Sequence, residues 1–576
     1  MCGWRSDQPI RSCERKRVVS GPLAHARSYI VIACIAVMFG AGCAKQAPPS
    51  AGSPQILRVS NRNEPADLDP AKTTLPDEFA VLRALLEGLL IPGADGGEPR
   101  PGAATRFDVS TDGLTYTFQL RPDAAWSDGT PVTAAHFEAA YQRLLTPATA
   151  APKASAFFPV KNARAYATGQ LADFSAVGIH AADARTLVIT LEQPTPRFPH
   201  YVASGPWLPV RPDVVAKYGR TWTRPEHFVG NGPFTLAEWR ADQRIVAKKN
   251  LHWHGAAGVR LAEIHFMRFD SGDSEERAYR AGQIDATMSV PSSKVEVYAR
   301  ERATELHRAP MIETRYLSFN SRRPPLDNEN VRRALAFAID RQKIVERVLK
   351  GGQPPAYRFL PDALRSAGGA GSPSRPGMVG VSTETQDGSE SRPHPAEHRF
   401  APDEARKLLA DAGVDPKKFP RFEVTGWSPS QTPVLEAVQA MWRQELGLEI
   451  AIAIREAKVH LSSLATGDYD IAFITAIPDV ADTTELFGDF VTGASENYPH
   501  WSNRNFDTLL AKAGGIADPT ARASILLQAE RQLLTSAPLT PIYFNPKIWL
   551  MSPRVHGWEE DRLWSRCYHT VYLDEK

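Results

Sequence analysis

Polar and hydrophobic residues alternate over 115–120, so that side chains at every second position share one face. This alternation predicts a strand whose buried face carries Tyr116, Phe118 and Leu120. Pro122 ends the strand, because proline has no backbone N–H to donate to a neighbouring strand.

The pattern then changes from a period of two to a helical period. A turn at 127–131 is followed by Thr133, a residue type that caps helix N-termini. The hydrophobic residues beyond it have the spacing of one helix face, at Phe137, Tyr141 and Leu144. Trp126 lies between strand and turn, and its predicted role is structural, with the ring packed under the turn.

The same two periods recur along the chain. Short alternating or apolar runs predict strands at 56–60, 187–191, 314–320, 421–425, 448–454 and 471–474. Helical spacing predicts helices at 79–90, 403–413, 434–446 and 521–534. A further helix carries Val331 and Leu335 on one face, and its Arg332 and Arg333 are expected to face solvent. Strands and helices alternate in the C-terminal half, which is typical of an α/β fold.

The N-terminal segment has the features of a secretory signal. Basic residues precede the apolar run 29–39, which is shorter than a membrane span of ~20 residues and is followed by small residues and Cys43. Residues 1–42 are therefore predicted to be a signal peptide. The segment is similar to a bacterial lipoprotein signal, which implies a lipid on Cys43 and a tether over 43–54. An uncleaved N-terminal anchor is the alternative.

Length, charge and cysteine content narrow the class of protein. The 576-residue chain exceeds the ~250–300 residues at which single cores stop growing, so more than one domain is expected. The leader holds six of the 67 Lys and Arg residues and two of the 65 Asp and Glu residues. The remainder is near neutral, which gives no reason to expect a nucleic-acid partner. Only Cys567 follows Cys43, so neither a disulfide framework nor a Cys-x-x-Cys metal site is expected.

Residues 362–398 differ in composition from the segments on either side. They are rich in Gly, Ser and Pro and contain little that packs, which predicts a flexible insertion. A partner-binding loop is the alternative, because the segment is longer than an ordinary connection.

Several ordered motifs resemble one protein family. The first motif is the turn Trp-Ser-Asp-Gly-Thr-Pro-Val-Thr-Ala, which begins at Trp126 after a strand that ends in Leu-Arg. The second is Asn231-Gly-Pro, which precedes a later strand. The third is the segment that starts at Tyr279, Tyr-Arg-Ala-Gly-Gln-Ile-Asp-Ala-Thr. These motifs are similar to those of the oligopeptide, dipeptide and nickel class of periplasmic solute-binding proteins, which is bacterial extracellular solute-binding protein family 5. The resemblance implies an α/β, two-lobed periplasmic binding protein fold of class II. It also implies an extra subdomain in the first lobe and a ligand cleft between the lobes.

The resemblance further implies a division of the chain. The expected parts are a first lobe at 55–290 with its extra subdomain at about 76–190, a second lobe at 291–540, and a return to the first lobe at 541–576. We expect a hinge where the chain crosses between the lobes, near 286–312 and 535–546. A ligand that binds the closed state better would then favour closure.

The candidate ligand site follows the apolar strand 471–474, where a loop carries Asp479. In peptide-binding relatives, an aspartate at the matching place pairs with the free α-amino group of the peptide, a charge-assisted interaction. The alternative is that Asp479 only caps the helix that starts near Asp482. The resemblance implies further cleft-wall residues, namely Leu75, Phe157, Met288, Ser289, Thr475 and Tyr543.

The implied function is the capture of peptides outside the cytoplasm for an ABC importer. The expected partners are a peptide, a permease with its ATPase subunits, and a membrane that holds the lipid anchor. The protein is expected to be a monomer in the periplasm or cell envelope, without a cofactor.

Enzymatic activity is not expected. The chain has no Gly-x-Ser-x-Gly elbow, no Gly-x4-Gly-Lys-Ser/Thr loop, no His-Glu-x-x-His and no dinucleotide glycine fingerprint, so no catalytic residue is assigned. Two alternatives remain open. One is a receptor for another solute, such as a sugar, a metal chelate or a cell-wall peptide. The other is a signalling or surface-binding protein that does not serve transport.

Overall fold

The computed structural model describes residues 54–62, 64–94, 97–362, 364, 398–559, 562–563 and 566–574. The predicted signal peptide, the proposed lipid site Cys43 and residues 365–397 of the expected insertion lie outside these ranges. No helix in the described ranges has the length and the apolar content that a membrane span requires.

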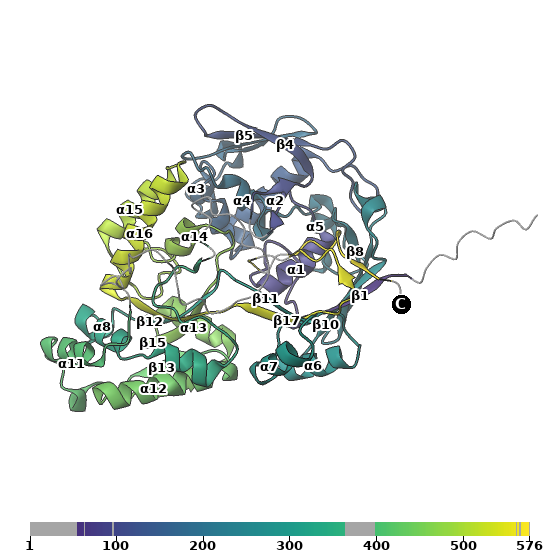
Figure 1. Cartoon of the computed structure of the whole chain (residues 1–576). Helices are drawn as coiled ribbons and strands as arrows, with labels where there is room; N and C mark the ends of the chain where they lie inside the picture. Colours follow the sequence, from purple (N-terminus) through teal and green to yellow (C-terminus); the bar gives the residue numbers. More distant parts are fainter. Residues whose placement is uncertain are drawn as a thin grey trace, which may run out of the picture. The chain divides into compact units, whose positions relative to one another are not determined.

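The first lobe is built on a four-stranded mixed sheet in the order β1-β10-β9-β8 (Figure 1). β1 pairs with β10 in parallel, and the other two pairs are antiparallel. The strands are β1 Ile56–Arg62, β8 Phe234–Arg240, β9 Arg244–Lys249 and β10 Glu263–Arg268. The helices of this lobe are α1 Pro76–Leu85, α6 Gly272–Arg280 and α7 Ser292–Glu301. The strand predicted at 56–60 is confirmed.

A second sheet, antiparallel and in the order β4-β5-β7-β6, forms the extra subdomain. Its strands are β4 Ala104–Val109, β5 Thr115–Leu120, β6 Ile179–Ala181 and β7 Thr186–Thr190. The accompanying helices are α2 Ala134–Leu145, α3 Ala163–Ala167, α4 Phe198–Val202 and α5 Pro212–Tyr218. The predicted strand over 115–120 and the helix capped by Thr133 are both confirmed.

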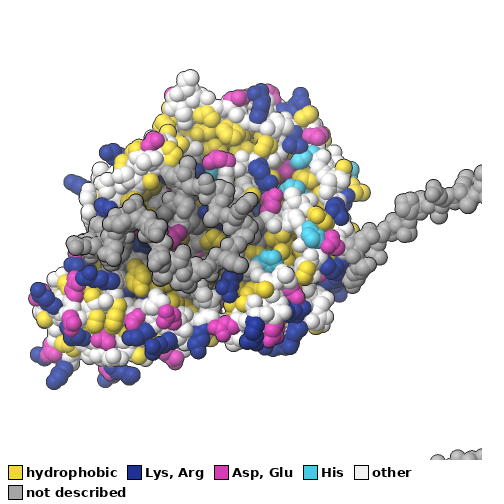
Figure 2. All heavy atoms as spheres, viewed as in Figure 1, with side chains coloured by type: hydrophobic (Ala, Val, Ile, Leu, Met, Phe, Trp, Pro, Cys, Tyr) yellow, Lys and Arg dark blue, Asp and Glu magenta, His cyan; other side chains and the backbone are white. Residues whose placement is uncertain are grey.

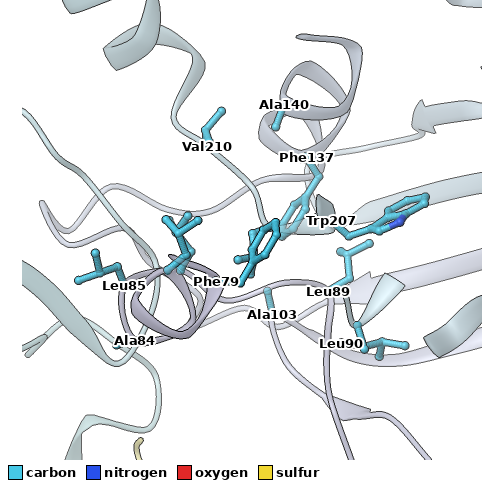
Figure 3. Packing of buried hydrophobic residues seen from close by; sticks show 14 of the residues in the cluster. Phe79, Ala84, Leu85, Leu89, Leu90, Ala103, Phe137, Ala140, Trp207 and Val210 are labelled. Atoms are coloured by element: carbon cyan, nitrogen blue, oxygen red, sulfur yellow. The ribbon is translucent and has the colours of Figure 1, made fainter. Parts of the chain in front are cut away.

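One continuous hydrophobic core joins the first lobe to this subdomain. Phe79 of α1, Phe137 of α2 and Trp207 all belong to it (Figure 3). The close packing restricts side-chain size at Gly205, where a Cβ atom would lie 2.3 Å from Cδ1 of Phe79. A short antiparallel pair, β2 Leu90–Ile91 and β3 Arg100–Pro101, lies beside these elements in the sequence.

Trp126 is fully buried, as predicted. Its indole N–H donates to Nδ1 of His136 at 3.2 Å, and the two rings meet edge to face. The turn that follows is anchored to the first lobe, because the backbone N–H of Ser127 donates to the carbonyl of Gly230 at 2.7 Å. The residue at 230 has to be glycine, since a Cβ there would lie 2.1 Å from the carbonyl oxygen of Leu85.

The second lobe contains a five-stranded sheet in the order β14-β13-β15-β12-β16. β13 is parallel to β14 and β15, whereas β12 is antiparallel to β15 and β16. The strands are β12 Thr314–Phe319, β13 Glu423–Gly426, β14 Ala451–Ile454, β15 Ile471–Ala476 and β16 Leu539–Phe544. The helices are α8 Glu329–Phe337, α9 Arg341–Lys343, the π-helix Ile344–Leu349, α11 Pro402–Asp411, α12 Thr432–Leu446, α13 Ala457–Thr466, α14 Thr483–Gly488, α15 Arg504–Gly514 and α16 Pro519–Ser536.

Strands β12, β15 and β16 of this sheet are buried on both faces, whereas the edge strand β14 is partly exposed. Successive residues of β12 point to opposite sides, so Leu317 enters one core while Tyr316 enters the other. The first core contains residues of α8, α11 and α12, and the second contains residues of α14, α15 and α16. On the outer face of α11 and α12, acidic and basic side chains are intermixed (Figure 2), which fits the near-neutral charge of the chain.

Two segments connect the lobes. β11 Leu306–Ala309 pairs with β17 Lys547–Leu550 in an antiparallel ribbon, which in Figure 1 lies between the sheets of the two lobes. Tyr298 of α7 packs in a small core with Tyr279 of α6 and Leu550, and we therefore propose that α7 belongs with the first lobe rather than with the second. β16 lies in the second-lobe sheet. We therefore propose that the crossings lie at 310–313 and 545–546, and that a final pair, β18 Val555–His556 and β19 Tyr572–Leu573, completes the first lobe.

Two buried basic groups of the second lobe differ from the expectation. Arg332, expected to face solvent, is only 4% exposed and donates to the carbonyls of Ser536 and Ala537 at the C-terminal end of α16. His398, expected to end the flexible insertion, is 1% exposed and lies in the core. Each side chain is held by groups that are distant in sequence. The pattern of hydrophobic and polar residues around Arg332 and His398 does not indicate these partners.

The hydrogen bonds of His398 fix its protonation state. Its Nε2 lies 2.8 Å from the carbonyl oxygen of Leu534, which can only accept, so Nε2 carries the proton. Its Nδ1 lies 2.9 Å from Oγ1 of Thr540, and Thr540 Oγ1 in turn accepts from Arg341 at 2.6 Å. Burial, together with the nearby Arg341 cation, lowers the pKa of His398 to about 3.

This neutral histidine makes stability depend on pH. Below pH ~6.5 the unfolded chain protonates His398 while the folded chain does not, so folding stability falls from pH 6.5 down to about 3. At pH 5 the expected loss is about 2 kcal/mol, at about 1.4 kcal/mol per pH unit. Urea unfolding of the parent and of His398→Gln at pH 7 and pH 5 measures it. The parent should lose about 2 kcal/mol more than the variant, and equal losses would contradict the assignment.

Candidate ligand-binding cleft

A cavity of about 460 Å³ lies between the lobes. This volume is in the range of small-ligand pockets, ~300–1,000 Å³. Its first-lobe and subdomain wall includes Thr74, Leu75, Asp77, Phe79, Arg83, Lys153, Gly205, Met288 and Ser289. Its second-lobe wall and hinge include Glu313, Arg315, Gln353, Trp427, Thr475, Ile477, Pro478, Asp479, Asn545 and Lys547.

Asp479 projects from the loop between β15 and α14. Its backbone N–H and that of Val480 donate to the carboxylate of Glu485, at 2.9 and 2.7 Å, which fixes the loop. The N-cap of α14 is Asp482, whose side chain accepts from the backbone of Thr484. Asp479 therefore does not cap this helix, and its side chain lines the cleft.

The partner of Asp479 in the structure is a lysine from the opposite wall. Nζ of Lys153 lies 2.8 Å from Oδ2 of Asp479, and each side chain is 26% exposed. Burial lowers the pKa of Lys153, but the carboxylate of Asp479, followed by those of Glu496 and Glu485, more than offsets this, so the pKa is raised and the ammonium persists. Burial also raises the pKa of Glu485, with a further contribution from Asp479.

A second basic residue of the subdomain contacts the same loop. Arg197, just before α4, donates to the carbonyl of Ala481 at 3.1 Å, and its Nε lies 3.5 Å from Asp482. Asp482 is also bound by Arg522 of α16, at 2.7 and 2.9 Å. Two basic side chains of the subdomain, those of Lys153 and Arg197, therefore hold the loop 479–482.

The hinge side of the cavity is organised around Glu313. Its carboxylate, 1% exposed, accepts from Arg315 at 2.8 Å and from the side-chain amide of Asn545 at 2.8 Å. The backbone N–H of Asn545 also donates to the Glu313 carbonyl. These bonds join the two crossing segments to each other and hold Arg315 beside Thr475, its neighbour across β12 and β15.

The structure brings together five of the seven predicted cleft residues. Leu75, Met288, Ser289, Thr475 and Asp479 all line the cavity. Leu75 precedes α1 and is 44% exposed. Met288 and Ser289 are held by the buried carboxylate of Glu275, which accepts from the Met288 N–H and from the Ser289 hydroxyl. Whether any of them contacts a ligand remains a prediction.

Phe157 and Tyr543 do not reach the cavity, which corrects the expectation for both. Phe157 is fully buried, and its ring stacks on Trp207 with a centroid separation of 3.8 Å. Tyr543 is 8% exposed and packs in the second-lobe core near Phe473. Phe157 ends a 3₁₀ helix, Ala154–Phe157, and Lys153, at the start of that helix, faces the cleft instead.

Sequence reasoning missed Lys153, Arg315 and Trp427. Arg315 is a charged residue in a strand that is otherwise uncharged, and such an interruption is a usable signal. Trp427 follows β13 and is 39% exposed, but exposure cannot be inferred from its neighbours in the chain. Lys153 lies in an irregular segment among small residues and carries no pattern at all. In the described part of the chain, no three His, Cys, Asp or Glu side chains are grouped as a metal site would require.

Comparison with known proteins identifies the family. Residues 98–498 match the family model described as bacterial extracellular solute-binding proteins, family 5 middle. The chain belongs to this family.

It is 32% identical over 507 residues to the probable deoxycholate-binding periplasmic protein YgiS of Escherichia coli K12, covering 87% of this chain and 90% of that protein. It is 31% identical to the periplasmic murein peptide-binding protein MppA of the same organism, covering 88% and 92%. It is 30% identical to the periplasmic oligopeptide-binding protein OppA of that organism, covering 92% and 95%.

Solved structures confirm the two-lobed binding-protein fold. The structure of the E. coli murein tripeptide binding protein MppA matches with a TM-score of 0.79 at 31% identity, covering 90% of this chain and 98% of that one. The unliganded open form of MppA matches with a TM-score of 0.69 at 30% identity, covering 91% and 99%. The lower TM-score against the unliganded open form accompanies the contacts that Lys153 and Arg197 make across the cleft of this protein.

Proposed function

We propose that this family 5 protein is the extracytoplasmic receptor of an ABC importer and that it captures peptides in the cleft between its lobes. The observation that carries the proposal is the position of the cavity, which is walled by both lobes and bounded by the two hinge crossings. MppA and OppA, which match over nearly the whole chain, are named as peptide-binding proteins.

Lobe closure supplies the signal for delivery. A ligand that contacts both walls binds the closed state better than the open state and shifts the population toward closure. The closed form would then be presented to a permease with its ATPase subunits. We place the protein in the periplasm, as its relatives are, and propose that it is a monomer held to the membrane by a lipid on Cys43.

An extended peptide suits the walls of this cavity. Peptides bound in extended form are held largely through their backbone, which makes the choice of side chains loose. The cavity offers Thr475 and Gln353 as polar partners, and Leu75, Met288 and Trp427 as apolar contacts.

Titration calorimetry with defined ligands tests this function. The expected result is binding of a pool of tri- to pentapeptides that includes N-acetylated members, with weaker or no binding of deoxycholate and of monosaccharides. A cavity-filling variant, Thr475→Trp, should abolish peptide binding without lowering the melting temperature substantially. Binding of deoxycholate alone would favour the ligand class for which YgiS is named, and peptide binding that survives Thr475→Trp would place the site elsewhere.

A further inference from the structure

The side-chain ammonium of Lys153 occupies the place beside Asp479 where the amino terminus of a peptide was expected. Lys153 Nζ lies 2.8 Å from Asp479, and both residues line the cavity. Lys153 comes from the subdomain and Asp479 from the second lobe, so the pair forms across the space that a ligand enters.

We infer that Lys153 sets the ligand class of this cleft and selects peptides that carry no free α-ammonium next to Asp479, such as peptides with a blocked amino terminus. This inference rests on the proposed peptide-binding function. It makes Lys153 a specificity-determining residue. Asp479 then serves the contact between the subdomain and the second lobe and does not anchor the ligand.

Glu485, Asp489 and Glu496 lie close enough to interact electrostatically with Lys153 but do not line the cavity, whose other carboxylates are Asp77 of α1 and Glu313. Glu485 lies directly behind the loop, but its two oxygens already accept from the backbone N–H groups of Asp479 and Val480. Glu313, on the hinge side, is bound by Arg315 and Asn545. To pair with Asp479, a peptide ammonium would have to displace Lys153.

Displacement leaves two cations beside the carboxylate of Asp479 in a partly desolvated site. Like charges placed that close disfavour each other, and the displaced Lys153 would lose its charge-assisted hydrogen bond. The described lining contains four basic side chains, Arg83, Lys153, Arg315 and Lys547, against three carboxylates, Asp77, Glu313 and Asp479. Glu485 and Glu496, which do not line the cavity, add negative charge close to Lys153 and favour its ammonium form.

A blocked amino terminus avoids this conflict. An N-acetyl group is neutral and presents a carbonyl oxygen, which can accept from an ammonium that stays bound to Asp479. Lys153 has three donor hydrogens, and a single bond to Asp479 leaves donors for such an acceptor.

The test compares a matched pair of peptides, trialanine and N-acetyl-trialanine, on the purified protein at pH 7. We expect the parent protein to bind the acetylated peptide at least about tenfold more tightly than the free-amine peptide, a factor that corresponds to one charge-assisted bond of about 1.4 kcal/mol. Lys153→Met should raise affinity for the free-amine peptide by about tenfold or more and reverse the preference. Lys161→Met, an exposed lysine of the same subdomain, is the matched control and should leave both affinities unchanged.

The outcomes separate this inference from the function on which it rests. If the parent prefers the free-amine peptide, Lys153 does not select against an ammonium and the inference is overturned while peptide binding stands. The same conclusion follows if Lys153→Met binds both peptides as the parent does. Because the comparison on the parent needs no substitution, it decides the question even if the variant is poorly folded. If neither peptide binds the parent, the proposed function fails and the inference fails with it.

Discussion

Replacing Trp126 by alanine is expected to lower the free energy of unfolding by roughly 3–5 kcal/mol, the usual cost of truncating a large buried aromatic residue. The side chain is fully buried, donates to His136, and packs where the turn of the subdomain meets the first lobe. Its loss opens a cavity and leaves His136 without this donor. Urea denaturation followed by circular dichroism measures the change.

Trp427→Ala is the control for this prediction. Trp427 is 39% exposed at the cleft, so its truncation creates no closed cavity and should cost little stability. Its effect is expected in ligand affinity instead. A loss below about 1 kcal/mol for Trp126→Ala, or equal losses for the two variants, would contradict the structural role of Trp126.

Replacing Asp482 by alanine is expected to destabilise the protein by about 3–5 kcal/mol, because one partner of a buried ion pair is removed and the other remains. The Asp482 side chain is 1% exposed and is bound by Arg522, while Arg197 approaches it from the subdomain. The substitution also removes the N-cap of α14. Ligand affinity should fall as well, since the loop that carries Asp479 is held at Asp482.

The contribution of Asp482 has a defined dependence on pH. Burial raises its pKa, but Arg522 and the hydrogen bonds from Thr484 outweigh burial, and the pKa in the folded state lies below the ordinary value of 3.8. The stabilisation is therefore complete above pH ~4 and is lost as the pH falls through the folded-state pKa. Unfolding measured from pH 7 down to pH 3 should show the parent and Asp482→Ala converging only at the acidic end.

Asp108→Ala is the matched control for the ion pair. Asp108 pairs with Arg106 at 3.2 Å, but both side chains are more than 60% exposed. A surface pair of this kind contributes ~0–1 kcal/mol. If Asp482→Ala cost no more than Asp108→Ala, the pair with Arg522 would not support the loop as described.

The elements of the fold were largely predictable, because periodicity is a local property. The strand over 115–120 and the helix after Thr133 agree with the structure, since alternation and helical spacing record which face is buried. Burial of single polar residues was not predictable. Arg332 and His398 are buried because carbonyl groups from α16 reach them, and no local pattern reports such partners.

The residues of the candidate site were likewise predictable where a local sequence pattern indicates them and not where partners are distant in the chain. Asp479 was found because it follows an apolar strand in a motif that resembles the family, and the structure places it in the cleft. Its partner Lys153 was missed, since the pairing joins residues 326 positions apart in the chain. Phe157 was assigned to the cleft although it points into the core, an error of four positions from the residue that faces the ligand space.

Native mass spectrometry of the protein as purified, without its leader, tests the central claim that the cleft is a peptide receptor. We predict a heterogeneous set of adducts at peptide masses, lost from Thr475→Trp, because backbone-mediated binding accepts many sequences. A single adduct of a non-peptide mass, present in the parent and lost from the same variant, would contradict that claim and assign the cleft to another solute.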